Sequence, residues 1–247
     1  MDLGLTGRTA IVCGSSQGIG LAIAEAFAAE GMNVAMFARR RKVLEMEAER
    51  IGALAVQGDV TNPQDCERVV VRTVEAFGGV DVLVNNSGGP PRGPALEIDD
   101  ESLEAAVALL LTSAVRLTNL CLPHLRRSSA GRVINIESST VKEPADNLAL
   151  SNAVRPGVVG WAKSLASEVG PEGITVNTIA PGRIDTARLA EVYPDGPSED
   201  DLKPIPLRRL GRPGEIAAAV CFLASDAASY VTGTVIPVDG GLVRSLL

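Results

Sequence analysis

A glycine-rich loop near the amino terminus offers the first residues whose types and spacing could do chemistry. It lies between the apolar stretch Thr9–Cys13 and the helix-like stretch Gly18–Glu30, and it contains Gly14, Ser15, Ser16, Gln17, Gly18, Ile19 and Gly20. Glycines in such a turn let a bound phosphate approach the backbone, and the helix amino terminus adds free N–H groups and the positive end of its dipole. This order of strand, loop and helix predicts a site for the pyrophosphate of a dinucleotide. An ordinary glycine-rich turn is the alternative.

The end of the second expected strand bears on which dinucleotide binds. Asn33–Phe37 is strand-like, and the chain continues through Arg39, Arg40 and Arg41 with no acidic residue. A carboxylate at this place would bind a ribose 2′-hydroxyl and repel a 2′-phosphate, whereas a guanidinium suits the phosphate. Arg39 and Arg40 therefore favour NADP(H) over NAD(H). The alternative is a solvated turn beside a helix start, and at most one or two of the three arginines can face a ligand.

The composition excludes several other classes of protein. The 247 residues include 23 Lys and Arg against 30 Asp and Glu, a net charge of −7, which argues against a nucleic-acid partner. A hydrophobic fraction of 46% excludes a disordered chain. No uncharged apolar run approaches the ~20 residues of a membrane span, and the amino terminus lacks a secretory pattern. One histidine and four scattered cysteines indicate no metal site. We expect a cytoplasmic protein with reduced thiols and no membrane partner.

Short apolar stretches alternate with longer amphipathic ones along the chain. The expected strands are Thr9–Cys13, Asn33–Phe37, Ala53–Gln57, Val80–Val84, Arg132–Ile136, Ile174–Ile179 and Thr234–Val238. The expected helices are Gly18–Glu30, Lys42–Ile51, Pro63–Phe77, Ser102–Leu125, Ala153–Val169 and Gly214–Ala224. This alternation predicts an α/β fold of the Rossmann type, a doubly wound parallel sheet of about seven strands with helices on both faces. We expect one domain over residues 1–247, with a lid-like insertion at about 187–212; a surface loop is the alternative for that insertion.

Four motifs together resemble those of the short-chain dehydrogenase/reductase family. They are the Gly14–Gly20 loop, Asn85–Gly88, Pro181–Thr186 and Tyr230–Gly241. The resemblance covers about Leu5 to Gly241, and the 3-oxoacyl-[acyl-carrier-protein] reductases look most similar. It implies an oxidoreductase that forms a homo-oligomer, a tetramer or dimer, and that acts on a small-molecule substrate.

The resemblance also implies roles for further cofactor-binding residues. Asp59, followed by Val60, would accept a hydrogen bond from the adenine amino group, although Asp59 could instead cap the helix that begins near Pro63. Ligands bind at the carboxyl ends of the strands, where the fourth strand is followed by Asn86, Ser87 and Gly88. Thr186 would meet the carboxamide or the pyrophosphate of the cofactor, in the segment that also contains Pro181, Gly182 and Ile184.

The catalytic positions depart from the family pattern of Asn, Ser, Tyr and Lys. Ser138 keeps the place of the family's serine at the end of a strand. The tyrosine position, 13 residues later, is Ser151, and the lysine position is Arg155. The asparagine falls near Leu110, which is apolar. The sequence therefore indicates an atypical subgroup that lacks the Tyr-x-x-x-Lys pair.

The replacements retain only part of the usual chemistry. An aliphatic hydroxyl is a far weaker acid than a phenol and needs help to act. An arginine stays protonated, so Arg155 cannot shuttle a proton, but it can bind the cofactor ribose or an anionic substrate. At i and i+4 on a helix, Ser151 and Arg155 share one face. We expect that helix to begin late, with Pro156 in its first turns. Since neighbours on a strand face opposite sides, we expect Glu137 to point away from the site.

Three functions remain open at this point. The first is an NADP(H)-dependent oxidoreductase of a carbonyl or alcohol, with catalytic residues Ser138, Ser151 and Arg155. Its proton donor would be Ser138, a water held by Ser138 and Ser151, or the substrate itself. The second is a catalytically silent nucleotide-binding or regulatory protein on the same scaffold. The third is non-redox chemistry such as elimination or isomerisation. For the three side chains themselves, inert structural or solvated roles are the alternatives.

Overall fold

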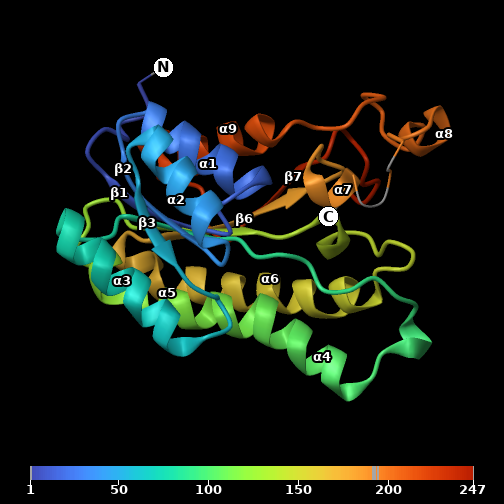
Figure 1. Cartoon of the computed structure of the whole chain (residues 1–247), viewed down its shortest axis with the longest axis horizontal. Helices are drawn as coiled ribbons and strands as arrows, with labels where there is room; N and C mark the ends of the chain where they lie inside the picture. Colours follow the sequence, from blue (N-terminus) through green and yellow to red (C-terminus); the bar gives the residue numbers. More distant parts are fainter. Residues whose placement is uncertain (1, 191–192, 194, 247) are drawn as a thin grey trace.

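A seven-stranded parallel sheet forms the centre of the molecule in the computed structural model, which describes residues 2–190, 193 and 195–246 (Figure 1). The strands follow the order β3-β2-β1-β4-β5-β6-β7. Their bounds are β1 Thr9–Cys13, β2 Asn33–Ala38, β3 Leu54–Gln57, β4 Val82–Asn85, β5 Arg132–Ile136, β6 Thr175–Pro181 and β7 Val235–Val238. The predicted strands agree with these to within two residues at each end. The strand order reverses between β1 and β4, so the connections that follow these two strands run in opposite directions. A doubly wound sheet has its ligand crevice at the carboxyl ends of the strands at such a point.

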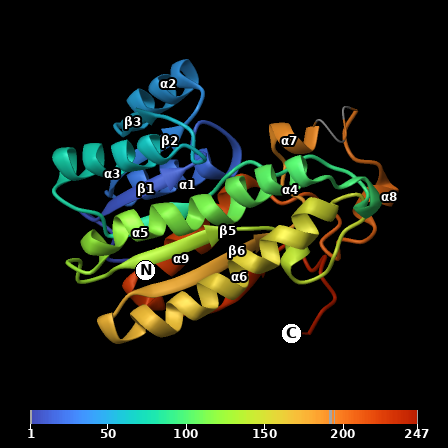
Figure 2. The same cartoon turned by 90° about the horizontal axis from the view of Figure 1, so that it is seen from below.

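Helices cover both faces of the sheet, as predicted (Figures 1 and 2). One face carries α1, α2 and α9, which share a hydrophobic cluster with the strands. The other face carries α3, α5 and α6 over a second cluster. The bounds are α1 Gly18–Ala29, α2 Arg41–Ile51, α3 Pro63–Phe77, α5 Ser113–Leu125, α6 Ala149–Val169 and α9 Pro213–Ala224. Because both faces are covered, β1 and β5 are buried along their whole length, which explains the apolar run from Ala10 to Cys13 in β1.

The expected helix Ser102–Leu125 is longer and is interrupted by a wider turn. It comprises α4 (Asp100–Val107), a π-helical turn at Ala108–Thr112, and α5. By length and composition alone, the helix Asp100–Leu125 could cross a membrane, and 39% of its apolar window is buried. Core helices of other proteins meet the same criterion, and this one packs against α3, α6 and β4.

The prediction of a late start for α6 is wrong. The helix begins at Ala149, so Pro156 lies in its interior. An interior proline costs roughly 3 kcal/mol. Leu150, Val154 and Val158 bury the early turns against α4 and the π turn. Burial of each such side chain contributes about 1.5–3 kcal/mol, so this packing outweighs the lost hydrogen bond.

The insertion at 187–212 contains two short helices, α7 Ala187–Ala190 and α8 Glu199–Leu202. Residues 191, 192 and 194 of the predicted lid lie outside the described residues. A bridge between Ile184 and Gly211 joins the two ends of the insertion, so it leaves and returns to the body of the protein at one place.

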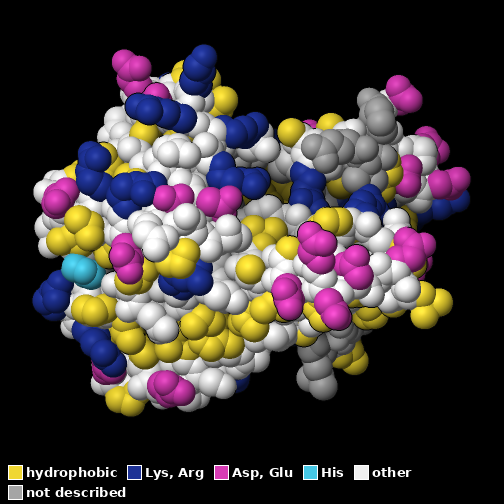
Figure 3. All heavy atoms as spheres, turned by 60° about the horizontal axis from the view of Figure 1, so that its bottom comes forward, with side chains coloured by type: hydrophobic (Ala, Val, Ile, Leu, Met, Phe, Trp, Pro, Cys, Tyr) yellow, Lys and Arg dark blue, Asp and Glu magenta, His cyan; other side chains and the backbone are white. Residues whose placement is uncertain are grey.

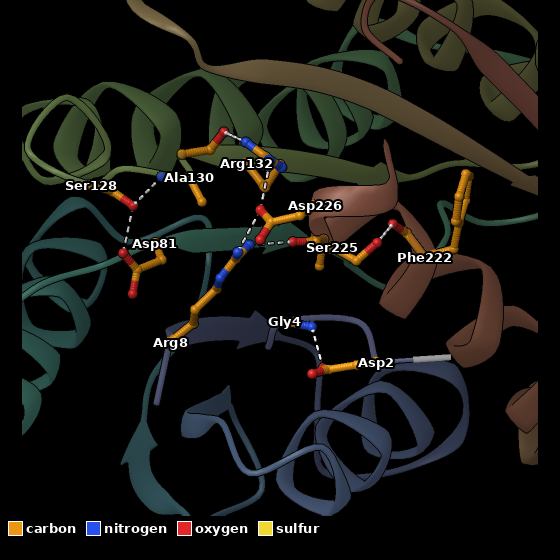
Figure 4. Close-up of polar contacts among 12 residues, drawn as sticks. Asp2, Gly4, Arg8, Asp81, Ser128, Ala130, Arg132, Phe222, Ser225 and Asp226 are labelled. Carbon is orange, nitrogen blue, oxygen red and sulfur yellow. Dashed lines mark hydrogen bonds and ion pairs between the residues drawn. The ribbon is translucent and has the colours of Figure 1, made fainter. Parts of the chain in front are cut away.

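A charged cluster closes the amino-terminal edge of the sheet. Figure 4 shows Arg8 and Arg132 converging on Asp226. Arg8 donates to Asp226 at 2.6 Å and to the Ala224 carbonyl at 3.0 Å, while Arg132 lies 3.8 Å from the same carboxylate. Nearby, Asp81 accepts hydrogen bonds from the backbone N–H of Thr9 and from the hydroxyl of Ser128. These contacts join the starts of β1 and β5 to the segment after α9.

Candidate active site

Two adjacent cavities lie at the carboxyl edge of the sheet. The first, of about 260 Å³, is lined by the glycine-rich loop and by the ends of β2, β3 and β4. The second, of about 770 Å³, is lined by the ends of β5 and β6, by α6 and by the insertion. The two cavities share Ile19, Asn86, Ser87, Gly88, Thr186 and Arg188 as lining residues. The two cavities therefore lie side by side along these residues.

The glycine-rich loop brings backbone close to the first cavity. Gly14 adopts a positive φ of 61°, and a Cβ on Gly20 would lie 2.4 Å from the Gly14 carbonyl oxygen. No side chain caps α1, so its first N–H groups remain available. Ser15 is buried and, unlike the other residues from Gly14 to Gly20, does not line this cavity; its hydroxyl has no partner among the described residues. A cradle of bare backbone at a helix amino terminus fits a phosphate ligand.

The three arginines after β2 separate into two groups. The Arg40 guanidinium donates to the Ser16 hydroxyl at 3.3 Å, which places it beside the glycine-rich loop. Arg39 lies 3.8 Å from Asp59, and its side chain is 74% exposed. Arg41 instead pairs with Glu45 along α2. Arg39 and Arg40 both line the first cavity, so two cations face the place predicted for the 2′-phosphate.

Asp59 and Val60 form another part of the wall of this cavity. Asp59 accepts hydrogen bonds from the N–H and the hydroxyl of Thr61. The alternative role of Asp59 as a helix cap is wrong, because the Asn62 side chain caps α3 by accepting from the N–H of Asp65. The contact of Asp59 with adenine stays a prediction.

The two asparagines at the end of β4 have different surroundings. The Asn85 side chain is buried and donates to Thr118 and Asn135, away from the two larger cavities. The Asn86 side chain donates to the Cys13 carbonyl at 3.0 Å and packs against Gly14 and Gly20. Asn86 therefore links the end of β1 to the wall that both cavities share.

The three predicted catalytic residues meet in the second cavity. Ser138 follows β5, and its hydroxyl accepts from the N–H of Thr140 at 3.2 Å. Ser151 and Arg155 lie one turn apart on α6, and the Nε of Arg155 donates to the Ser151 hydroxyl at 3.1 Å. The Thr140 hydroxyl lies 3.1 Å from the same oxygen. The structure thus brings Ser138, Ser151 and Arg155 to one cavity, as their spacing predicted.

The prediction that Glu137 points away from the site is wrong. Its carboxylate accepts from Arg155 at 2.9 Å, with only 5% of the Glu137 side chain and 8% of the Arg155 side chain exposed. The alternation rule does not decide here, because β5 ends at Ile136 and α6 brings Arg155 to the strand end. Burial raises the pKa of Glu137 to about 7, and Arg155 lowers it by less. The sequence signal was the arginine itself, since a buried guanidinium needs a counter-ion.

The position that corresponds to the family's asparagine is occupied by Leu110, which makes apolar contacts. Leu110 is buried in the π turn and packs in one cluster with Leu150 and Val154 of α6. A small cavity of about 10 Å³ separates this turn from the end of β5 and is lined by Leu110, Ser113 and Glu137 among others. The π turn therefore packs against the catalytic helix and contributes no polar side chain at Leu110.

The segment after β6 forms the floor of the second cavity. Pro181, Gly182 and Ile184 line it, and a Cβ on Gly182 would lie 2.7 Å from the Cα of Asp239. Thr186 lines both cavities. Arg188, in α7 of the insertion, donates to the carbonyls of Gly89 and Pro90, which follow β4.

Metal-binding groups are not found within residues 2–190, 193 and 195–246: no cluster of three or more His, Cys, Asp or Glu side chains occurs there. The cysteines Cys13, Cys66, Cys121 and Cys221 are buried and unpaired by disulfides. The chemistry of the site therefore depends on the hydroxyl, guanidinium and carboxyl groups described above and on any ligand that the two cavities hold.

Comparison with known proteins agrees with this geometry. The family described as enoyl-(acyl carrier protein) reductase matches residues 14–243. The 3-oxoacyl-[acyl-carrier-protein] reductase of Vibrio cholerae is 37% identical over 97% of this chain and 99% of its own. The corresponding reductase of Haemophilus influenzae is 38% identical over 98% of this chain and 100% of its own.

Two solved structures share the complete architecture. YwfH, an NADPH-dependent reductase involved in bacilysin biosynthesis, has a TM-score of 0.92 at 28% identity and covers 97% of this chain and 99% of its own. L-Sorbose reductase from Gluconobacter frateurii, solved with NADPH and L-sorbose, has a TM-score of 0.89 at 33% identity and covers both chains completely, at 100% each. The predicted family and Rossmann-type fold are thereby confirmed, and the chain belongs to the short-chain dehydrogenase/reductase family as a nicotinamide-dependent oxidoreductase.

Proposed function

We propose that this protein is an NADP(H)-dependent oxidoreductase that interconverts a carbonyl compound and an alcohol at Ser138, Ser151 and Arg155. One observation carries the proposal. The cavity with the features of a dinucleotide site shares six lining residues with the cavity that contains these three side chains, so the two lie side by side. A nicotinamide that follows the shared wall would lie beside them.

The first cavity fits the phosphate groups of the cofactor. The glycine-rich loop and the amino terminus of α1 would hold the pyrophosphate. Arg39 and Arg40 would hold the 2′-phosphate, which supports NADP(H) over NAD(H). When bound, the cofactor supplies the two electrons and the hydrogen that a carbonyl carbon needs for reduction.

The second cavity supplies hydrogen-bond donors to the substrate oxygen. The Ser138 hydroxyl already accepts from Thr140, and the Ser151 hydroxyl already accepts from Arg155. A hydroxyl whose oxygen is engaged in this way still has its own O–H to donate. Either hydroxyl can be the donor in the contact between Thr140 and Ser151; when Thr140 donates, both serine O–H groups are left to point at one substrate oxygen. Such donors stabilise negative charge that develops on that oxygen, and a water held between the two serines would deliver the proton.

The insertion and the oligomeric state complete the proposal. The insertion would act as a lid, since Arg188, Leu189, Tyr193 and Pro204 line the second cavity from that side.

We also propose that the protein forms a homo-oligomer through an exposed apolar surface. Figure 3 shows hydrophobic side chains gathered in a band over the lower face of the molecule, and the exposed apolar residues of α3 and α4 include Val71 and Leu103.

Calorimetric titration with NADPH and then NADH, followed by a panel of carbonyl compounds, tests the proposal. We expect NADPH to bind at micromolar concentration or tighter, NADH to bind more weakly, and at least one carbonyl to be reduced. Tight binding with no turnover of any carbonyl or alcohol would favour the silent protein. Product formed without a change in NADPH absorbance would identify non-redox chemistry instead.

A further inference from the structure

The buried carboxyl group of Glu137 has no part in the proposed function as stated above. Three acidic side chains line the second cavity among the described residues, and Glu143 and Asp146 are exposed whereas Glu137 is buried. Glu137 also lies directly before Ser138, at the end of β5. Burial of a carboxylate costs free energy unless a counter-ion and hydrogen bonds compensate for the lost water, so the surroundings of Glu137 must provide that compensation.

Arg155 links Glu137 to the proposed chemistry. Its guanidinium is held at two nitrogens, with NH1 donating to Glu137 at 2.9 Å and Nε donating to Ser151 at 3.1 Å. Two fixed donors prevent a planar guanidinium from turning. The carboxylate therefore determines where Arg155 lies, and Arg155 determines how the Ser151 hydroxyl is oriented.

We propose that Glu137 is a positioning residue that holds Arg155 against Ser151 and, by gaining or losing its own proton, changes the net charge of the buried pair between +1 and zero. This inference rests on the proposed function for its effect on catalysis, but the change in charge can be measured without turnover.

The surroundings of Glu137 leave Arg155 as the charged group that contacts it among the described residues. The side chains that share the small cavity with Glu137 come from β1, from β4 and its loop, and from the π turn with α5; the polar ones are Cys13, Asn85, Asn86, Ser87 and Ser113. Burial raises the pKa of the Cys13 thiol, so that group is neutral. Charged groups elsewhere on the wall of the larger cavity are Arg92, Glu143, Asp146, Arg183, Arg188 and Arg244. Burial accordingly raises the pKa of Glu137 to about 7 in spite of Arg155.

The change in charge has a definite direction for catalysis. Reduction of a carbonyl places negative charge on the substrate oxygen, and a site with charge +1 stabilises that charge better than a neutral site. Reduction is therefore favoured when Glu137 is protonated, and oxidation of the alcohol is favoured when it is ionised. NADPH is itself an anion, and negative charge brought next to the second cavity disfavours the ionised form of Glu137, so binding of NADPH draws a proton onto that carboxyl group.

The test compares Glu137→Gln with Glu75→Gln, a control in an exposed carboxyl group on α3 that lines neither of the two larger cavities. Glutamine keeps an acceptor for Arg155 but cannot ionise. The first readout is the pH profile of kcat/KM for reduction. We expect kcat/KM of the wild type to fall at least threefold through an inflection near pH 7 and Glu75→Gln to behave like the wild type. Glu137→Gln should stay within threefold of its low-pH value at every pH.

The second readout needs no turnover. Calorimetry of NADPH binding at about pH 7.5, in two buffers that differ in heat of ionisation, measures the protons taken up; the 2′-phosphate, with a pKa near 6, is already ionised there. We expect up to one proton per nucleotide for the wild type and for Glu75→Gln, and almost none for Glu137→Gln. If no carbonyl is reduced, the proposed function fails while this measurement still decides the role of Glu137.

Two results would overturn the inference. One is an unchanged inflection and proton uptake in Glu137→Gln, which would assign the titration to another group. The other is a folded Glu137→Gln that binds NADPH normally but has lost reduction, which would show that the proton of Glu137 is itself transferred. If Glu137→Gln does not fold, Arg155→Met replaces it. Loss of the cation should move the inflection upward, and an inflection that stays near pH 7 contradicts the inference.

Discussion

A buried arginine lies at each end of β5, Arg132 from the strand itself and Arg155 from α6, and the two arginines differ in their partners. At the amino end, Arg132 is 4% exposed and lies near Asp226, whose side chain is 67% exposed. At the carboxyl end, Arg155 is similarly buried, but its partner Glu137 is buried as well. Arg8 lowers the pKa of Asp226, whereas burial raises the pKa of Glu137 to about 7. The cluster at the amino edge therefore keeps a constant charge near neutral pH, and the pair at the carboxyl edge does not.

The charged groups at the two ends of β5 therefore have different roles: those at the amino end stabilise the fold, and those at the carboxyl end act in the site. A carboxylate in contact with water keeps its charge and can join elements of the fold, as Asp226 joins the starts of β1 and β5. A carboxyl group enclosed beside a cavity responds to the ligand in that cavity. Substitutions at the amino edge should therefore change the free energy of unfolding, and substitutions at the carboxyl edge should change rates.

The largest expected effect is on catalysis by Arg155→Met. The substitution removes the donor to Ser151 and the counter-ion of Glu137. We expect kcat to fall by about 10²–10³-fold, the magnitude typical for loss of an electrostatic group at a reaction site. Steady-state kinetics measure this effect. Arg155→Lys should recover part of the rate, and an unchanged kcat in Arg155→Met would remove Arg155 from the site.

The next effect is on the choice of cofactor. In the double variant Arg39→Ala with Arg40→Ala, the affinity for NADPH should fall by roughly 10–100-fold, because hydrogen bonds to charged groups contribute about 1.5–3 kcal/mol. The affinity for NADH should change little, and the ratio of the two dissociation constants measures the effect. Arg41→Ala is the matched control, since Arg41 pairs with Glu45. An equal loss for both nucleotides would contradict recognition of the 2′-phosphate.

The matched change at the other end of β5 is Arg132→Met. It leaves the polar contacts around Gly131 and Asp226 unmade. We expect a loss of about 1–3 kcal/mol in the free energy of unfolding, with kcat per folded molecule unchanged. Urea denaturation and kinetics on the same sample separate the two quantities. A reduced kcat at full stability would abolish the contrast between the two edges.

The pH dependence of stability provides a further contrast. The pKa of Glu137 is higher in the folded state than in the unfolded chain, so the folded state binds more protons between about pH 4.5 and 7. This group favours folding at low pH, and that contribution declines as pH rises to about 7, by on the order of 3 kcal/mol. Glu137→Gln removes the decline, so its stability relative to the wild type should rise across this range. The free energies of unfolding of both proteins, measured by thermal melting at several pH values, test this prediction. A difference between the two proteins that stays constant from pH 4.5 to 7 would contradict the raised pKa of Glu137.

The smallest expected effect concerns Asp226→Asn and has the opposite sign. The pKa of Asp226 is lowered by Arg8, so this carboxylate stabilises the fold above its unfolded pKa and loses that effect as pH falls through the folded one. Because the carboxylate is largely exposed, we expect the substitution to cost no more than about 1 kcal/mol at neutral pH. The wild type and the variant should become equally stable in acid, as measured by thermal unfolding at both pH values.

Much of the fold and of the cofactor cavity could be predicted from the sequence, because local patterns determine them. The alternation of apolar and amphipathic stretches in the sequence predicts the order of strands and helices. The glycines at 14, 18 and 20 are required by local backbone geometry. The start of α6 could not be predicted, since it depends on packing of Leu150 and Val154 against a helix about forty residues earlier in the chain. The direction of Glu137 likewise depends on Arg155, a contact that no local rule contains.

Consumption of NADPH by the wild type and by Arg155→Met, with 3-oxoacyl thioesters and ketoses among the carbonyl compounds, tests the central claim most directly. We expect the wild type to oxidise one NADPH for each alcohol formed. Arg155→Met should bind NADPH but lose at least 99% of that rate, in keeping with the fall of about 10²–10³-fold expected for loss of an electrostatic group. Tight binding of NADPH by the wild type with no consumption on any carbonyl, or equal rates for both proteins, would contradict it.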